Sequence, residues 1–299
     1  MKRLKIYAEL MRINRPVGTL LLLWPTLAAL WMASSGLPTT ELLVIFGVGT
    51  FVMRSAGCVI NDIVDRDVDP YVERTSERPL ARRAIGVGEA LVLAIVLFAI
   101  GGALAYQLST TTLIWAGGGA VLALIYPFAK RFTYLPQVIL GAAFSWGIVL
   151  AFIQVQGAMT SPAWILFVGS LLWIVAYDTF YAMVDREDDI QIGVKSTAVL
   201  FGDGAITIVL LLQLSVLGVW YLVGSNMEYH YPYYIALAAI AALFLMQQLT
   251  VQTQPSLDED DAVIQRRAYL KAFKSNTWVG LALFFGVVAE LTLLPMLHS

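Results

Sequence analysis

The residues best placed to do chemistry form an acidic stretch, Asn61 to Asp69, directly after a long apolar run. If a helix continues through it, Asn61, Asp65 and Asp69 recur at i, i+4 and i+8 and share one face, with Asp62 beside them. Carboxylates held this close repel one another, so the arrangement is costly unless a cation binds between them. Ligand sets made only of oxygen favour a hard ion, magnesium before zinc. We therefore expect Asn61, Asp62, Asp65 and Asp69 to bind Mg²⁺.

A second acidic stretch, Asp185 to Asp189, follows another apolar run. A shift of 120 residues places Asp65 on Asp185 and Asp69 on Asp189, which predicts two pseudo-repeats within one domain spanning residues 1–299. On a continuous helix Tyr181 shares a face with both aspartates of the second stretch. Two acidic helix ends can hold a metal-bound diphosphate between them. The alternative is that these are solvated charges that terminate helices, but two matching copies make it the weaker interpretation.

The composition excludes an ordinary soluble domain. The chain has 299 residues, of which 59% are hydrophobic and only 13% charged, as in a polytopic membrane protein. The net charge of −2 gives no indication of a nucleic-acid partner. The pattern predicts an all-α protein with nine membrane spans, at about 17–35, 41–60, 89–107, 112–128, 135–154, 163–183, 204–224, 232–250 and 277–296.

The distribution of positive charge predicts the topology. Of the 19 lysines and arginines, all but Arg54 lie in the N-terminal tail or in the loops after the second, fourth, sixth and eighth spans. The positive-inside rule then places the N-terminus in the cytoplasm, the C-terminus outside, and both acidic stretches at the cytoplasmic face. The basic tail is expected to lie on the membrane surface as an amphipathic segment.

Several basic residues near the acidic stretches are expected to bind a diphosphate: Arg66, Lys130, Arg131 and Lys195. Positive-inside anchoring is the competing explanation, above all for Lys130 and Arg131. Arg54 differs from all of them because it lies within a span, seven residues before Asn61 and about two helical turns deeper. An arginine inside the membrane is costly without a partner, so we expect it to have a function.

Other sites are excluded more simply. His230 and His298 are far apart, which argues against zinc ligation and against a Ser-His-Asp triad. The stretch Gly86-Val87-Gly88 does not follow a strand, so a dinucleotide-binding loop is improbable. The acidic segment 255–266 has mixed charges without helical register and is expected to be a solvated surface.

The two acidic patterns, Asn-Asp-x-x-Asp-x-x-x-Asp at 61–69 and Asp-x-x-x-Asp at 185–189, resemble the signatures of the UbiA superfamily of intramembrane prenyltransferases. Within it, the stretches 54–62, 126–137 and 177–189 are most similar to members that prenylate 4-hydroxybenzoate in ubiquinone biosynthesis. The resemblance covers nearly the whole chain and weakens over residues 251–266. It implies nine helices around a central cavity with a lateral opening to lipid and cytoplasmic cap helices, in a bacterial inner membrane.

The resemblance also implies a reaction. Mg²⁺ would promote ionisation of a polyprenyl diphosphate, and the allylic cation would alkylate 4-hydroxybenzoate ortho to its hydroxyl. A chamber within the bilayer would shield that cation from water. Metal ligation is carried over to Asn61, Asp65, Asp69, Asp185 and Asp189.

Further roles are expected for individual side chains. Asp65 and Asp185 are expected to be catalytic, and Asp185 to accept the phenol proton. Arg131 matches the basic position after the fourth span, and Tyr181 is expected to bind substrate. Arg54 would hold the carboxylate of the acceptor below the metal site. The alternative for Arg54 is that it only ties helices together.

Three other functions stay open. The first is a UbiA-type enzyme with another aromatic acceptor. The second is a CDP-alcohol phosphotransferase, although Arg66 follows Asp65 where that pattern has glycine. The third is an ion-coupled transporter, whose acidic residues usually lie nearer the membrane midplane. The sequence sets neither the prenyl chain length nor the oligomeric state.

Overall fold

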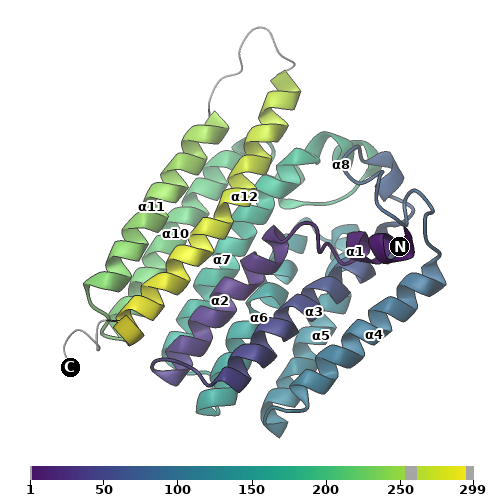
Figure 1. Cartoon of the computed structure of the whole chain (residues 1–299). Helices are drawn as coiled ribbons and strands as arrows, with labels where there is room; N and C mark the ends of the chain where they lie inside the picture. The colour runs from purple at the N-terminus through teal and green to yellow at the C-terminus, as the bar shows by residue number, and fades with distance from the viewer. Residues whose placement is uncertain (1, 253–260, 294–299) are drawn as a thin grey trace.

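The structure is a computed structural model that describes residues 2–252 and 261–293. Within that part of the chain the regular structure is entirely helical, and nine helices are long and apolar enough to cross a membrane, as predicted. They run alongside one another in Figure 1. Their bounds are α2 (Val17–Ser34), α3 (Thr40–Asp65), α4 (Val87–Ala105), α5 (Thr110–Phe132), α6 (Pro136–Gln156), α7 (Ser161–Val184), α10 (Ala205–Asn226), α11 (Tyr231–Gln252) and α12 (Asp261–Val288).

Local sequence signals account for many of the helix ends. Thr39 and Ser109 cap α3 and α5, because each side chain accepts a hydrogen bond from a backbone N–H three residues on. Pro136 lies in the first turn of α6, where the missing N–H costs little. The same helix stops at Gly157, whose φ of 75° is a left-handed conformation that favours glycine.

Three spanning helices, α3, α5 and α12, extend well beyond their predicted spans. α3 continues to Asp65, beyond the expected end at residue 60, and so carries the start of the first acidic stretch. α12 begins at Asp261, whereas the predicted span began at 277. The added turns of α12 contain Arg, Lys and Ala, which favour helix formation. Their charged side chains make this segment too polar to be predicted as a membrane span. The acidic segment 255–266, expected to be a solvated surface, lies partly outside the described residues.

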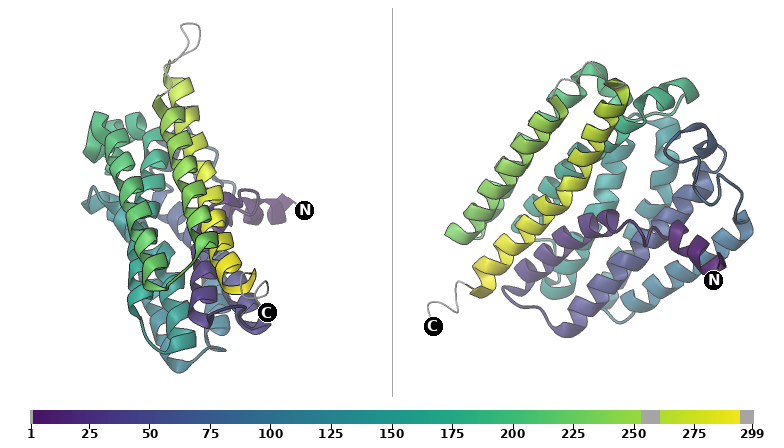
Figure 2. Two further views of the ribbon diagram at one scale, coloured as in Figure 1. Left: turned by 90° about the vertical axis from the view of Figure 1, so that its left-hand side faces the viewer. Right: turned by 45° about the horizontal axis from the view of Figure 1, so that its top comes forward.

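The largest core packs α2, α6, α7, α10 and α12 together. Trp173 of α7 and Trp220 of α10 are fully buried at its centre, with ring centroids 5.7 Å apart in an edge-to-face arrangement. A second cluster joins α3 and α4 to the short helix α1 (Lys2–Leu10), through the fully buried Leu10. α1 points sideways out of the bundle in Figure 2, which fits the expected surface segment.

Short helices occupy the loops that follow the two acidic stretches. They are the 3₁₀ turn η1 (Asp69–Tyr71) after α3, and α8 (Arg186–Ile192), α9 (Thr197–Phe201) and the 3₁₀ turn η2 (Gly202–Gly204) after α7. Figure 1 shows α8 at one end of the bundle, above α7. The loop after α7 thus contains two short α-helices, whereas the loop after α3 contains only the turn η1, and the expected cap helices stay a prediction. Their cytoplasmic location stays a prediction.

Candidate active site

A cavity of about 1080 Å³ lies inside the bundle, and side chains of both acidic stretches line it. Its walls come mainly from α2, α3, α4, α5 and α6, with further residues from α7 and α12. Most of its deeper lining is apolar, so a reactive cation formed there would meet few water molecules. The predicted site residues that line it are Arg54, Asn61, Asp65, Asp69, Lys130, Tyr181, Asp185, Asp189 and Lys195.

The predicted acidic stripes required each acidic stretch to lie on one continuous helix. In the structure, each stretch instead spans a break between two helical segments. α3 ends at Asp65, and Asp69 begins the separate turn η1. α7 ends at Val184, and Asp189 lies on α8. A break lets each pair of aspartates approach from two backbone directions, which a straight helical stripe does not. In both motifs the break falls at the first of the two equivalent aspartates, Asp65 and Asp185. This is consistent with two pseudo-repeats, which stay a prediction.

Asp65 holds the centre of the first motif. One of its carboxylate oxygens accepts a hydrogen bond from the Asn61 amide at 3.0 Å and is 2.5 Å from the Lys130 ammonium of α5. The other oxygen, Oδ1, is buried and has no hydrogen-bonding partner. A buried carboxylate oxygen without a partner is costly, and a bound cation would satisfy it.

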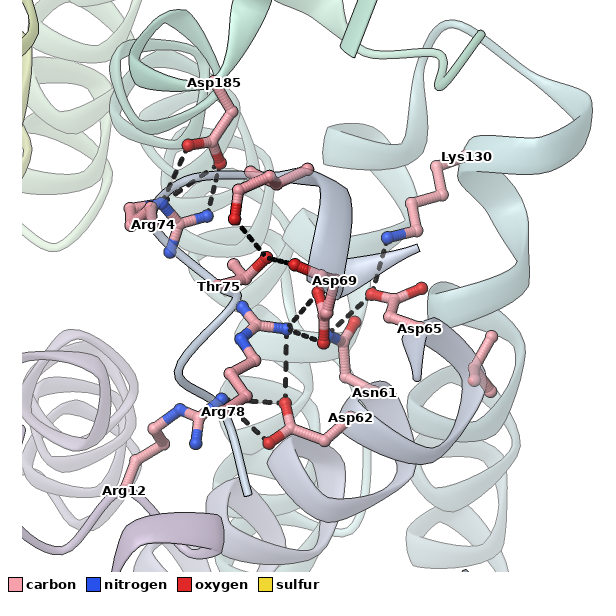
Figure 3. Close-up of polar contacts among 12 residues, drawn as sticks. Arg12, Asn61, Asp62, Asp65, Asp69, Arg74, Thr75, Arg78, Lys130 and Asp185 are labelled. Atoms are coloured by element: carbon pink, nitrogen blue, oxygen red, sulfur yellow. Dashed lines mark hydrogen bonds and ion pairs between the residues drawn. The ribbon is translucent and has the colours of Figure 1, made fainter. Parts of the chain in front are cut away.

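Asp69 is held by the loop that follows it. Arg78 donates to both of its carboxylate oxygens, at 3.0 and 3.1 Å, and the Thr75 hydroxyl donates to its backbone carbonyl at 2.9 Å. Figure 3 shows Asp69 between Arg78 and the Asn61–Asp65 pair. Burial raises the pKa of Asp69 to about 6, although the Arg78 charge opposes this shift. A carboxyl group with this pKa can bind a metal near neutral pH by losing its proton.

The second motif is tied to the first by Arg74. Its Nε donates to both oxygens of Asp185, at 2.9 and 3.1 Å, and Nη1 donates to the Tyr181 hydroxyl. The Arg74 guanidinium also lies over the Tyr181 ring, 4.3 Å from its centroid. The carboxyl group of Asp189 has its pKa raised to about 7 by burial and by the Asp185 charge, against the opposing effect of Lys130.

Three predicted site residues do not line the cavity. Asp62 is fully buried but turns away from Asp65, toward Arg12 at 2.7 Å and Arg78 at 3.2 Å (Figure 3). Two arginines neutralise its charge here, and its expected role as a metal ligand stays a prediction. Sequence spacing missed this, since Asp62 lies one residue off the Asn61–Asp65 face.

The other two are basic and also lie outside the cavity. Arg66 is exposed, pairs with Asp67 at 3.1 Å and donates to a carbonyl of its own helix end. Arg131 is exposed and donates to the Val64 carbonyl at 2.7 Å. That contact holds the end of α5 against the end of α3. Neither guanidinium lines the cavity, and the expected roles of Arg131 in catalysis and of Arg66 in substrate binding stay predictions.

Arg54 lies deeper in the cavity wall, as its spacing predicted. It contacts the Cys58 sulfur through Nη1 and lies 5.7 Å from the Phe144 ring centroid. Its buried Nε has no hydrogen-bonding partner, and the guanidinium has no ion pair among the described residues. Gly18 of α2 makes room for it, because a Cβ there would lie 2.6 Å from Nη2. Such a cation has donors to spare for an anionic ligand.

Several residues of the site were given no role by the sequence analysis. Arg74 and Arg78 reach it from the loop after the first motif, and Asp178 and Gln137 line the cavity from α7 and α6. A signal for the two arginines was present: they lie four residues apart directly after the acidic stretch. Their targets could not be predicted, because Asp185 is distant in the sequence.

The residues fit a divalent cation chemically, although they do not yet surround one. Among the described residues, no three His, Cys, Asp or Glu side chains are grouped closely enough to hold a metal ion as they stand. Arginines and Lys130 neutralise the carboxylates instead. A cation would therefore exchange with these internal positive charges, and the unpartnered Oδ1 of Asp65 gives it a first ligand.

Fold and site are those of a polytopic membrane protein with an acidic chamber facing basic loops. A profile of the UbiA prenyltransferase family matches residues 22–289, and the chain belongs to that family. A 4-hydroxybenzoate octaprenyltransferase of Tolumonas auensis is 48% identical over 282 residues, covering 94% of this chain and 95% of that protein. The enzyme of the same name from Pseudomonas syringae pv. tomato is 47% identical, with 96% and 94% covered.

Solved structures share the fold at low sequence identity. A UbiA homolog from Aeropyrum pernix K1, solved in its apo form, has a TM-score of 0.77 at 22% identity and covers 91% of this chain and 97% of its own. A UbiA homolog from Archaeoglobus fulgidus bound to GPP and Mg²⁺ has a TM-score of 0.66 at 20% identity, with 95% and 99% covered. These likenesses show that the chain shares the fold of the UbiA homologs.

Proposed function

We propose that this protein transfers a polyprenyl group from polyprenyl diphosphate to the ring of 4-hydroxybenzoate, ortho to the hydroxyl, with release of diphosphate. The observation that carries the proposal is one cavity with the carboxylates of both motifs at one end and the guanidinium of Arg54 deeper inside. Relatives that are 47–48% identical over nearly their whole length are named 4-hydroxybenzoate octaprenyltransferases. That name also supports an eight-isoprene donor.

The diphosphate end of the site would be built by both motifs. Asn61, Asp65, Asp69, Asp185 and Asp189 would hold Mg²⁺, which supplies positive charge to the leaving diphosphate. Arg74, Arg78, Lys130 and Lys195 line the same part of the cavity. Once Mg²⁺ neutralises the carboxylates, these basic side chains are free to donate to diphosphate oxygens instead. UbiA homolog structures bound to Mg²⁺ and to GPP or DMAPP support this arrangement.

The acceptor end would lie deeper, at Arg54. A carboxylate entering a low-dielectric cavity needs a cation, and this guanidinium has an unused donor. Binding the carboxylate there directs the phenol ring back toward the cleaved carbon. Asp185 would then take the phenol proton and raise the nucleophilicity of the ring. For this step Asp185 must be released by Arg74, which now donates to it.

We also propose the membrane arrangement. The relatives are bacterial proteins, which supports an inner-membrane location. The distribution of lysine and arginine supports a cytoplasmic N-terminus, an external C-terminus and an active site that opens on the cytoplasmic side. A pair of acidic motifs at helix ends also fits a transporter less well than an enzyme.

The decisive experiment supplies purified protein in proteoliposomes with octaprenyl diphosphate, Mg²⁺ and a panel of aromatic acids, followed by mass spectrometry of the products. The expected product is 3-octaprenyl-4-hydroxybenzoate, formed together with diphosphate and abolished by chelation of the metal. Preference for a naphthoate or homogentisate acceptor would replace this assignment with another UbiA-type reaction. Absence of diphosphate release with every acceptor would favour the transporter.

A further inference from the structure

A second hollow lies on the outer face of α12, at the end that extends beyond the predicted span. It measures about 510 Å³. We call it the α12 groove, and it is lined by Arg267, Leu270, Lys271, Lys274, Ser275 and Trp278. No part of the reaction described above uses it.

The α12 groove is basic along one helical face. Arg267, Lys271, Lys274 and Trp278 follow one another at i, i+4, i+7 and i+11, and all four are exposed. Neither Lys271 nor Lys274 has an ion pair among the described residues. By contrast, Arg266 on the adjoining face bonds Glu73 at 2.7 Å and Glu187 at 3.0 Å. The lysines of the groove are therefore available to an external anion.

The position of the groove along α12 matches the membrane interface. The uninterrupted apolar segment of this helix was predicted to begin at residue 277, and Trp278 lies at that boundary. Exposed tryptophan is favoured at the level of the lipid head groups. Lys271 and Lys274 lie one to two turns beyond it on the side that carries the acidic motifs, where lysine is attracted to anionic lipid. A lipid in the groove would thus have its phosphate beside Lys271 and Lys274 at the head-group level and its hydrocarbon chain beyond Trp278, within the membrane.

The α12 groove adjoins the active-site cavity. Leu270 and Lys274 line both hollows. Asn14 and Arg15, from the connection between α1 and α2, line the cavity as well. Figure 1 shows α12 passing beside α2, and the two helices pack together. Lys274 therefore stands where a phosphate could pass from the outer face of α12 to the cavity without losing contact with positive charge.

We infer that the α12 groove is a docking site for the diphosphate head of the lipid substrate, which binds there from the membrane before it enters the cavity. The inference rests on the proposed function. Lys271 and Lys274 donate to the diphosphate, the Trp278 ring packs on the first isoprene units, and Lys274 passes the head group inward. If the groove only anchored a phospholipid, there would be no reason for it to share the lining residues Leu270 and Lys274 with the cavity.

The test compares two donors that differ in how they reach the enzyme. Octaprenyl diphosphate is embedded in phosphatidylcholine vesicles, whereas geranyl diphosphate is supplied from water. Lys271→Glu is the main variant because Lys271 lines the groove but not the cavity. Lys5→Glu is the matched control, since Lys5 is an exposed lysine of α1 that lines neither hollow and its replacement changes the net charge equally.

Lys271→Glu is expected to raise the apparent KM for embedded octaprenyl diphosphate about tenfold, the size of one lost charge-assisted contact. The KM for geranyl diphosphate should change less than about twofold, and Lys5→Glu should leave both KM values near wild type. Equal rises for both donors, or no rise for either, would overturn the docking site.

A series of vesicles with increasing phosphatidylglycerol distinguishes the phosphate of an anchoring phospholipid from the diphosphate of the donor. If Lys271→Glu abolishes stabilisation of the protein by phosphatidylglycerol but leaves the KM for embedded donor unchanged, the groove holds an anchoring phospholipid and the inference fails. Failure of the proposed function has a different signature, because the wild-type protein would then turn over neither donor.

Discussion

Arg74 and Asp185 join the two acidic motifs directly: the guanidinium of a residue in the loop after the first motif donates to the carboxylate of the second, at 2.9 and 3.1 Å. The two residues are 111 positions apart, and their contact ties the loop after α3 to the end of α7. Both side chains are mostly buried, so the pair resists solvent screening better than a surface ion pair does.

We expect Arg74→Met to lower kcat/KM for polyprenyl diphosphate about ten- to a hundredfold, because a charge-assisted contact of ~1.5–3 kcal/mol is lost. The KM for 4-hydroxybenzoate should change much less. Steady-state kinetics with each substrate varied in turn would measure the difference. A variant that melts at a lower temperature but keeps wild-type kcat/KM would show that Arg74 is structural only.

Asp65→Asn and Asp185→Asn should each abolish most turnover while leaving the helical content intact, because each removes a ligand or a base rather than packing. The matched control is Asp67→Asn, which changes an exposed carboxylate of the same motif and should retain near-wild-type activity. Product formation at limiting Mg²⁺ and far-UV circular dichroism would be measured together. Near-normal activity of either site variant would disprove the two-motif site.

Arg54→Ala should raise the KM for 4-hydroxybenzoate roughly ten- to a hundredfold and that for the prenyl diphosphate much less. Arg54→Lys should recover part of the loss, since a point charge lacks the planar fork. Gly18→Ala offers an independent check, because the added Cβ would displace the guanidinium without removing its charge. It should raise the same KM selectively. Equal effects of these variants on both substrates would favour a scaffold role for Arg54.

Magnesium affinity should rise with pH. Burial raises the pKa of Asp69 to about 6 and that of Asp189 to about 7, so both hold protons in the metal-free protein that Mg²⁺ must displace. The same protons favour the folded metal-free state at low pH, and this contribution is lost as pH rises through these values. Thermal stabilisation by Mg²⁺ should therefore need about tenfold more metal at pH ~6 than at pH ~8. Asp189→Asn should bind Mg²⁺ more weakly but with a flatter pH dependence near 7, and a pH-independent affinity of the wild type would contradict the mechanism.

The topology can be tested with reporters. A fusion after Ser299 should be found outside the cytoplasm and one inserted near Glu77 inside it, because an odd number of predicted spans lies between the two sites. Accessibility to a membrane-impermeant label would check both sites. Finding the two reporters on the same side would mean that the number of spans is even.

The sequence alone determined the class of fold, the number of spans among the described residues and the location of both acidic motifs. These follow from local properties: apolar run length, charge bias and the spacing of a few aspartates. It also predicted that Arg54 lies deeper than Asn61 on the same side, because both are on one uninterrupted helix, α3.

The tertiary structure decided which charges meet. Helical spacing placed Asp62 beside the other expected metal ligands, whereas Arg66 and Arg131 were expected at the site because they lie near the acidic stretches and, for Arg131, because of the family resemblance. None of the three lines the cavity. α3 ends at Asp65 and α7 ends just before Asp185. The loop after α3 folds back, so that Arg74 pairs with Asp185 and Arg78 pairs with Asp69. Contacts between residues far apart in the sequence depend on loop paths and on desolvation, and neither leaves a periodic trace in a single sequence. The basic face of α12 was not predicted either, because a polar helix end lacks the hydrophobicity by which a membrane span is recognised.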